Sequence, residues 1–195
     1  MSLRGYSLKE THALFPTCVM EFDLSESIET INVLLDIIKQ SRSENHEFIS
    51  GGESSYHSGY NILDFKEVKP LKDIIELCIN DYCIKTGLDK VSIANSWWNK
   101  LGTGGNVDYH RHYCSIISGA FYPLAGPGSG ELIFNSPLSH YRMNEAYKTY
   151  NHFSAQHIVM PAKQYHMYLF PSWLEHGVKM NNAEDRLVVS FNADR

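Results

Sequence analysis

Cysteine is scarce in this chain, and its four residues include no Cys-x-x-Cys pair. They are Cys18, Cys78, Cys83 and Cys114. This spacing argues against a zinc knuckle, which needs closely spaced cysteine pairs. Scattered cysteines without an apolar run of signal-peptide length fit a reducing compartment, so we expect a cytoplasmic protein. A chain of 195 residues is long enough to bury a core that needs no disulfide staple.

The sequence also lacks an excess of positive charge, a membrane-length apolar run and a low-complexity linker. With 17 Lys+Arg against 22 Asp+Glu, its formal net charge is −5 at pH 7, which argues against nucleic acid as a partner. No stretch is apolar for long enough to span a bilayer, so we expect no membrane partner. We expect one domain over residues 1–195, with a helical half at about 1–90 and a β-rich half at about 91–195.

The first half of the chain contains two helical patterns. Apolar residues recur at helical spacing after a capping Asp23, which predicts a helix over about 25–41. A second helix is predicted to begin near Pro70 and to end at Gly87, because these residues favour a first turn and a helix end respectively. A short strand is predicted ahead of both helices, over 14–22.

Two segments with few apolar residues are predicted to be loops. Segment 41–60 is polar and contains Gly51-Gly52, and we expect its histidines, His46 and His57, to be solvated. Segment 140–152 is rich in tyrosine. Loops around a site commonly carry its specificity, so we expect both segments to act as lids.

The second half of the chain consists of short apolar runs separated by turns. The runs cover 91–98, 115–124, 131–134, 156–160, 166–170 and 186–192. Many short strands at close spacing are typical of a sandwich, jelly roll or barrel. We predict a mainly β fold with flanking helices: a double-stranded β-helix, or cupin-like jelly-roll core, buttressed by two N-terminal helices.

Three of the ten histidines form a pattern typical of a metal site. His110 and His112 are two residues apart at a predicted strand, so their side chains point to the same face. His176 follows a turn 66 positions later, and a jelly roll can place such a strand opposite the first. Three imidazoles would hold a non-haem iron on one side and leave positions open. Without His176, the pair could equally be two exposed histidines on an edge strand.

Arg186 follows His176 after ten residues, in the last predicted strand. An arginine that points into a closed pocket is costly unless it meets an anion. Its planar fork suits a carboxylate, which it can bind through two parallel hydrogen bonds. A surface arginine near the end of the chain is the other interpretation.

These residues occur together with further short motifs, in one order along the chain. The motifs are 14–17, 97–99, 110–112, 118–122, 170–176 and 186–192. In this combination the chain resembles the Fe(II)- and 2-oxoglutarate-dependent oxygenase superfamily, which has a His-x-Asp/Glu pair, a distal His and an Arg about ten residues further on. It is most similar to a branch of 2-oxoglutarate oxygenases found in bacteria and phages.

The resemblance implies a dioxygenase that couples decarboxylation of 2-oxoglutarate to succinate with the oxidation of a substrate by O2. The implied cofactors are Fe(II), 2-oxoglutarate and O2. The aromatic and basic loop residues would suit a peptide, an amino acid or a nucleotide as substrate, and a peptide or amino-acid side chain is the default among these. The implied iron ligands are His110, His112 and His176. The implied contacts to 2-oxoglutarate are Arg186, Asn99 and Tyr122. No catalytic side chain is expected beyond the metal centre.

One position departs from the superfamily's pattern, because a carboxylate is usual where this chain has His112. A neutral imidazole there leaves an Fe(II) site one unit more positive, which favours a dianionic co-substrate. Asp108 is the alternative third ligand, in a reversed Asp-x-His order. Two other classes stay open: a three-His metal dioxygenase or cupin-type enzyme that does not use 2-oxoglutarate, and a non-enzymatic jelly-roll binding module. Arg186 is the residue that favours a 2-oxoglutarate-dependent oxygenase over these two alternatives.

Overall fold

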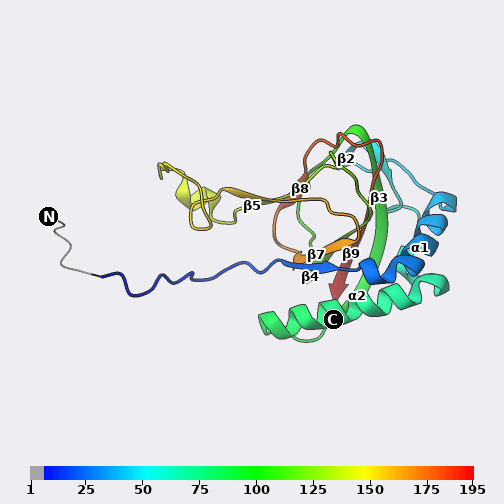
Figure 1. Cartoon of the computed structure of the whole chain (residues 1–195), viewed down its shortest axis with the longest axis horizontal. Coiled ribbons are helices and arrows are strands. Elements are labelled where there is room, and N and C mark those ends of the chain that lie inside the picture. The colour runs from blue at the N-terminus through cyan, green and yellow to red at the C-terminus, as the bar shows by residue number, and fades with distance from the viewer. Residues whose placement is uncertain (1–6) are drawn as a thin grey trace.

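The computed structural model describes residues 7–195 and is built around one nine-stranded antiparallel sheet that curls on itself (Figure 1). Its strands are β1 (Met20–Asp23), β2 (Ile49–Ser54), β3 (Ser92–His110), β4 (Ile117–Leu124), β5 (Leu132–Asn135), β6 (His157–Met160), β7 (His166–Pro171), β8 (His176–Val178) and β9 (Arg186–Asp194). They follow the order β1-β7-β4-β9-β3-β8-β5-β6, and β2 pairs with β3 off this path.

Strand β3 links the two parts of the curled sheet. Its first half pairs with β9, from Ser92 opposite Asp194 to Leu101 opposite Arg186. Its second half pairs with β8, and there His110 lies opposite His176. A single strand of 19 residues therefore connects the C-terminal strand with the strand that carries the third predicted metal ligand.

The two helices are α1 (Ile28–Gln40) and α2 (Lys69–Thr86), close to the predicted ranges. Asp23 accepts a hydrogen bond from the backbone N–H of Ser25 (2.9 Å) in the short 3-10 turn that precedes α1. Pro70 lies in the first turn of α2, and Gly87 ends the helix in the left-handed conformation that glycine adopts without steric cost (φ 72°).

The apolar side chains form two clusters on opposite faces of the sheet. On the outer face, both helices pack against alternate residues of β4, β7 and β9, which are Ile117, Phe121, Met167, Leu169, Leu187, Val189 and Phe191. On the inner face lies a second cluster, which includes Ala120, Tyr122, Leu132, Phe134, Tyr168, Phe170 and Val188. The period-two alternation of a strand produces this division, and the predicted helical buttress is confirmed.

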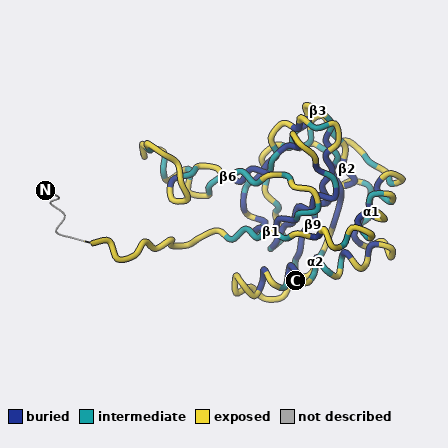
Figure 2. The backbone as a smooth tube through the Cα atoms, in the orientation of Figure 1, coloured by how far each residue is buried: buried dark blue, intermediate teal, exposed yellow. Residues whose placement is uncertain are grey.

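Two of the predicted boundaries are wrong. The expected strand at 14–22 forms only from Met20, where pairing with β7 begins, and most of the segment before it is exposed (Figure 2). Segment 41–60 is not a continuous loop, because β2 forms within it and pairs with β3. Gly52 permits this pairing, since a Cβ there would lie 2.3 Å from the backbone oxygen of Lys100.

Between β5 and β6 the chain runs out from the body of the protein, and its surface is largely exposed (Figures 1 and 2). This projecting segment includes the predicted lid at 140–152. Among residues 7–195, no helix combines the length and the hydrophobicity that a membrane-spanning helix needs.

Candidate metal centre

The structure brings the three predicted metal ligands together inside the curled sheet. His110 ends β3, His112 follows two residues later, and His176 begins β8 in register with His110. The ring centroids of His110 and His176 are 4.4 Å apart, and each lies 5.1 Å from that of His112. One nitrogen from each ring lies within 4.8 Å of the other two, which is close enough for one ion to bind all three.

Each imidazole is held through its Nδ1 by an oxygen atom. Nδ1 of His110 lies 2.8 Å from the carbonyl oxygen of Asp108, and Nδ1 of His176 lies 2.9 Å from that of Leu174. A carbonyl oxygen only accepts hydrogen bonds, so these Nδ1 atoms carry the proton and the Nε2 atoms keep a free lone pair. Such partners are typical of metal-binding histidines, because they fix both the tautomer and the ring orientation.

His112 is held in the same way, but by side chains. Its Nδ1 lies 2.5 Å from Oδ1 of Asn192 on β9. The Ser118 hydroxyl donates to the same Oδ1 at 2.8 Å and lies 2.8 Å from the Ser172 hydroxyl. His112 therefore also presents Nε2 to the centre, although no backbone carbonyl holds it.

Burial keeps the three histidines neutral. Desolvation lowers the pKa of His110, and it lowers the pKa of His112 to about 4 and that of His176 to about 3. At pH 7 all three imidazoles are in the unprotonated form, which is the form that binds metal.

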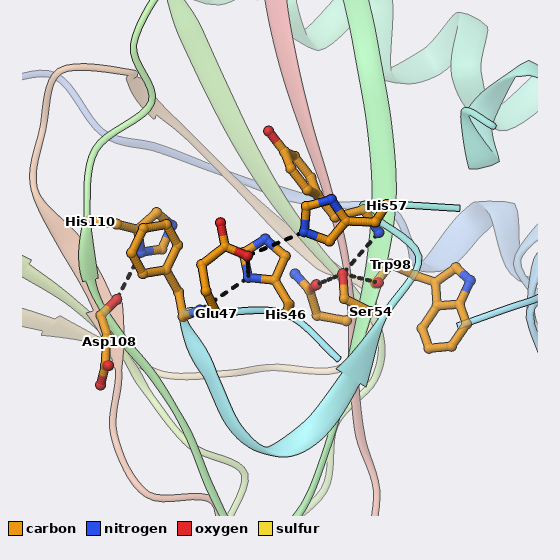
Figure 3. A network of polar contacts seen from close by, with 10 residues as sticks. His46, Glu47, Ser54, His57, Trp98, Asp108 and His110 are labelled. Carbon is orange, nitrogen blue, oxygen red and sulfur yellow. Dashed lines mark hydrogen bonds and ion pairs between the residues drawn. The ribbon is translucent and has the colours of Figure 1, made fainter. Parts of the chain in front are cut away.

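Asp108, the alternative third ligand, does not join this cluster. It is exposed, and its backbone oxygen rather than its carboxylate contacts the ring of His110. Figure 3 shows the carboxylate of Asp108 turned away from that ring.

The three histidines open into a pocket of about 460 Å³ that also contains the predicted co-substrate residues. Arg186 is completely buried there: its Nε donates to the carbonyl oxygen of Gly130 (2.9 Å) and its Nη2 to the hydroxyl of Tyr122 (3.3 Å). Its Nη1 has no hydrogen-bond partner. No carboxylate in residues 7–195 forms an ion pair with Arg186, so a buried cation faces the pocket with a donor free for an anion.

Asn99 also lines the pocket, but its amide is already engaged. It is hydrogen-bonded to the Ser54 hydroxyl at 2.6 Å and to the Ser190 hydroxyl at 3.3 Å. Asn99 therefore joins β2 and β9 to β3, and a bound molecule would have to compete with these partners for it.

Sequence reasoning missed two groups of residues in this site. Asn192 could have been found by counting every second residue along the last strand, because Arg186, Val188, Ser190 and Asn192 all line the pocket. The second group comes from the segment 46–56, which forms one side of the pocket. His46 was expected to be solvated, yet its side chain is only 11% exposed. The predicted lid at 140–152 contributes no residue to the pocket lining.

Comparison with known families identifies the chain. Residues 95–192, about half of the chain, match the family described as "Putative 2OG-Fe(II) oxygenase". The chain belongs to this 2OG-Fe(II) oxygenase family. This oxygenase therefore uses Fe(II), 2-oxoglutarate and O2, and the match favours that activity over the 2-oxoglutarate-independent enzyme and the non-enzymatic module. A search of curated proteins gives no match.

Solved structures show that the fold of this oxygenase is the double-stranded β-helix. A Pseudomonas putida prolyl-4-hydroxylase is similar, with a TM-score of 0.60 at 12% identity over 92% of this chain and 94% of the other. A Trichoplax adhaerens prolyl hydroxylase in complex with a peptide fragment gives 0.60 at 13% over 90% and 83%. HygX from Streptomyces hygroscopicus, with nickel and 2-oxoglutarate bound, gives 0.58 at 12% over 91% and 82%. The predicted fold class is confirmed.

Proposed function

We propose that this oxygenase binds Fe(II) through His110, His112 and His176, and binds the distal carboxylate of 2-oxoglutarate through Arg186. The observation that carries the proposal is the unpartnered Nη1 of the buried Arg186, in the same pocket as the three converging imidazoles. A dicarboxylate suits this arrangement, because one end can reach the metal while the other meets the guanidinium fork.

The proposed ligand set is three neutral imidazoles, with no carboxylate. Imidazole suits iron as a ligand. The set leaves the charge of Fe(II) uncompensated by protein, which strengthens the attraction for a dianionic co-substrate. The exposed, outward-facing carboxylate of Asp108 supports this set over the alternative with Asp108 as a ligand.

The remaining pocket residues would orient the proposed ligands and exclude water from the metal centre. The Tyr122 hydroxyl accepts from Arg186, and its phenol ring lies 5.1 Å from the guanidinium carbon, so both groups keep the fork in place. Phe48 stacks on His110 (5.4 Å) and Trp97 lies 5.7 Å from His112, which shields the metal centre from one side. Bound iron and 2-oxoglutarate would supply the oxidative chemistry, in which 2-oxoglutarate gives succinate and CO2 while O2 oxidises the substrate.

We assign the primary substrate to the class of peptide or amino-acid side chains. The prolyl hydroxylases with a similar fold support this assignment, and one of them was crystallised with a peptide fragment. Exposed Tyr113 at the pocket edge offers a stacking surface to an extended chain, beside Arg111, which pairs with Glu175 at 3.3 Å. Peptides should stimulate succinate formation above the rate without substrate, whereas equal stimulation by an aminoglycoside such as hygromycin B would contradict the assignment.

The test of the co-substrate site uses the visible charge-transfer band of an Fe(II)–2-oxoglutarate chelate, recorded without oxygen. The band should form in the unmodified chain and be absent in His176→Ala. Arg186→Ala should need about tenfold to a hundredfold more 2-oxoglutarate, because a hydrogen bond to a charged group contributes roughly 1.5–3 kcal/mol. Arg195→Ala is the matched control, since Arg195 pairs with Asp89 at the surface. Equal 2-oxoglutarate affinity in Arg186→Ala and Arg195→Ala would overturn the assignment of Arg186.

A further inference from the structure

A second group of metal-ligating side chains lies at the rim of the pocket, outside the three central histidines. It consists of His46, Glu47 and His57, and we call it the rim cluster. Oε2 of Glu47 lies 3.2 Å from Nε2 of His57 and 3.8 Å from Nδ1 of His46, as Figure 3 shows. One ligand atom from each residue lies within 4.8 Å of the other two.

The donor atoms of the rim cluster are already oriented toward one another. The backbone N–H of Phe48 donates to Nδ1 of His46 at 3.2 Å, so this nitrogen is unprotonated, and a bound cation would replace this long hydrogen bond at its lone pair. The ring centroids of His46 and His57 are 5.3 Å apart with an interplanar angle of 24°. Both rings lie beside the carboxylate of Glu47.

The rim cluster is accessible from solution. The side chains of Glu47 and His57 are 61% and 45% exposed, whereas that of His46 is 11% exposed. One anchored ligand with two solvent-facing ligands leaves a route for an ion to enter and a free side for water or another molecule to bind.

We propose that the rim cluster is a second metal site, which binds a divalent transition cation, with Zn²⁺ as the best match. Two imidazoles and one carboxylate form a recurrent protein ligand set for Zn²⁺ with an open fourth position. Calcium and magnesium prefer oxygen ligands, and the cluster offers only one side chain with oxygen donors.

A cation in the rim cluster would fasten the two ends of β2 together. His46 and Glu47 precede this strand, and His57 follows it. Phe48 comes directly after Glu47 and stacks on His110 at 5.4 Å and 8°. The bound ion would therefore hold one wall of the pocket against the central histidines.

The test is equilibrium dialysis of the untagged, metal-free chain against Zn²⁺. We expect two bound equivalents, because Zn²⁺ also suits the three central imidazoles. His57→Gln and Glu47→Gln should each lose one equivalent, with at least tenfold weaker binding at the rim. His176→Ala should lose the other equivalent and keep the rim site. Glu53→Gln, a change in another exposed glutamate of the same segment, is the matched control and should keep both equivalents.

The outcomes separate this inference from the proposed function. If the unmodified chain binds one equivalent that His176→Ala abolishes and His57→Gln leaves intact, the rim site is overturned and the central site stands. If one equivalent is bound that His57→Gln abolishes and His176→Ala leaves intact, the rim site stands and the central assignment fails. Two equivalents that persist in both His57→Gln and Glu47→Gln would also overturn the rim site. Near-UV circular dichroism verifies that each variant keeps its tertiary structure.

Discussion

Asn192 fixes the orientation of His112, and removing its side chain is expected to weaken Fe(II) binding. Oδ1 of Asn192 lies 2.5 Å from Nδ1 of His112 and accepts from the Ser118 hydroxyl at 2.8 Å. In Asn192→Ala the N–H of His112 loses this acceptor, so the imidazole is free to turn its Nε2 away from the other two rings. Because His112 has no backbone carbonyl as a partner, it is the proposed ligand most sensitive to such a change.

The size of the effect follows from the partners that remain. Loss of a hydrogen-bond partner to a metal ligand typically weakens metal binding 10- to 100-fold, or about 1.4–2.7 kcal/mol. Oγ of Ser118 lies 3.1 Å from Nδ1 of His112 and can accept the proton in place of Asn192. We therefore expect Asn192→Ala to bind Fe(II) about tenfold more weakly, and the double variant with Ser118→Ala to bind it about a hundredfold more weakly.

The assay is anaerobic competition for Fe(II) against a coloured chelator. Asn192→Asp should bind Fe(II) at least as tightly as the unmodified chain, since a carboxylate is a stronger acceptor for the His112 N–H and makes its ring a better ligand. Asn182→Ala, at an exposed asparagine in the turn before β9, is the control. Fe(II) affinities of Asn192→Ala and Asn182→Ala that agree within twofold would refute the role of Asn192. A double variant no weaker than the single one would refute the compensation by Ser118.

Three further outcomes are expected. Arg186→Lys should raise the 2-oxoglutarate KM by roughly tenfold, less than Arg186→Ala, because lysine keeps the charge but loses the planar fork; a KM equal to that of the unmodified chain would contradict the proposed two-bond contact. Gly119→Ala should lower the free energy of unfolding by about 1–3 kcal/mol, since the added Cβ would lie 2.0 Å from the buried ring of Phe191. An unchanged urea midpoint would contradict this, because it would mean that Phe191 moves aside with no loss of stability. The free energy of unfolding of the metal-free protein should fall as the pH is lowered from 7.5 to 5.5. In the unfolded chain His112 and His176 take up protons near pH 6.5. In the native state their pKa values, about 4 and about 3, prevent this uptake. The loss should be about 1.4 kcal/mol for each histidine, and a His176→Leu variant with the same pH dependence as the unmodified chain would disprove this origin.

The central residues could be predicted because strand periodicity and sequence spacing are properties of the chain itself. Histidines at i and i+2 of an extended chain point to the same side, and this holds here although β3 ends at His110 and His112 lies two residues beyond it. His176 could be predicted because it follows a turn and starts a new strand at a separation that a jelly roll can place opposite His110, and the structure does pair these two residues. Arg186 could be predicted because an arginine on an inward strand position needs an anion.

The residues that were missed depend on tertiary contacts that leave no periodic signal. The β2 sequence, Ile-Ser-Gly-Gly-Glu-Ser, has no apolar alternation, and the strand exists because Gly52 lets its backbone approach Lys100 closely. The pairing of β2 with β3 places the residues before β2 at the pocket, and His46 is therefore part-buried. The burial of His46 results from the pairing of β2 with β3. The polar residues around His46 in the sequence carry no sign of that pairing, and they therefore predicted a solvated side chain.

The charges of the pocket are separated by depth, which explains how one cavity can attract both an anion and a cation. The whole chain carries a formal charge of −5, yet among the described residues that line the pocket Glu47 is the only carboxylate. Arg111 is compensated by Glu175 at 3.3 Å, so Arg186 is the uncompensated buried cation of the lining. The field of Arg186 favours a dianion at the buried end, whereas Glu47 favours a cation at the exposed rim. Binding of 2-oxoglutarate should therefore respond strongly to Arg186→Ala and little to Glu47→Gln, and Zn²⁺ at the rim should show the reverse.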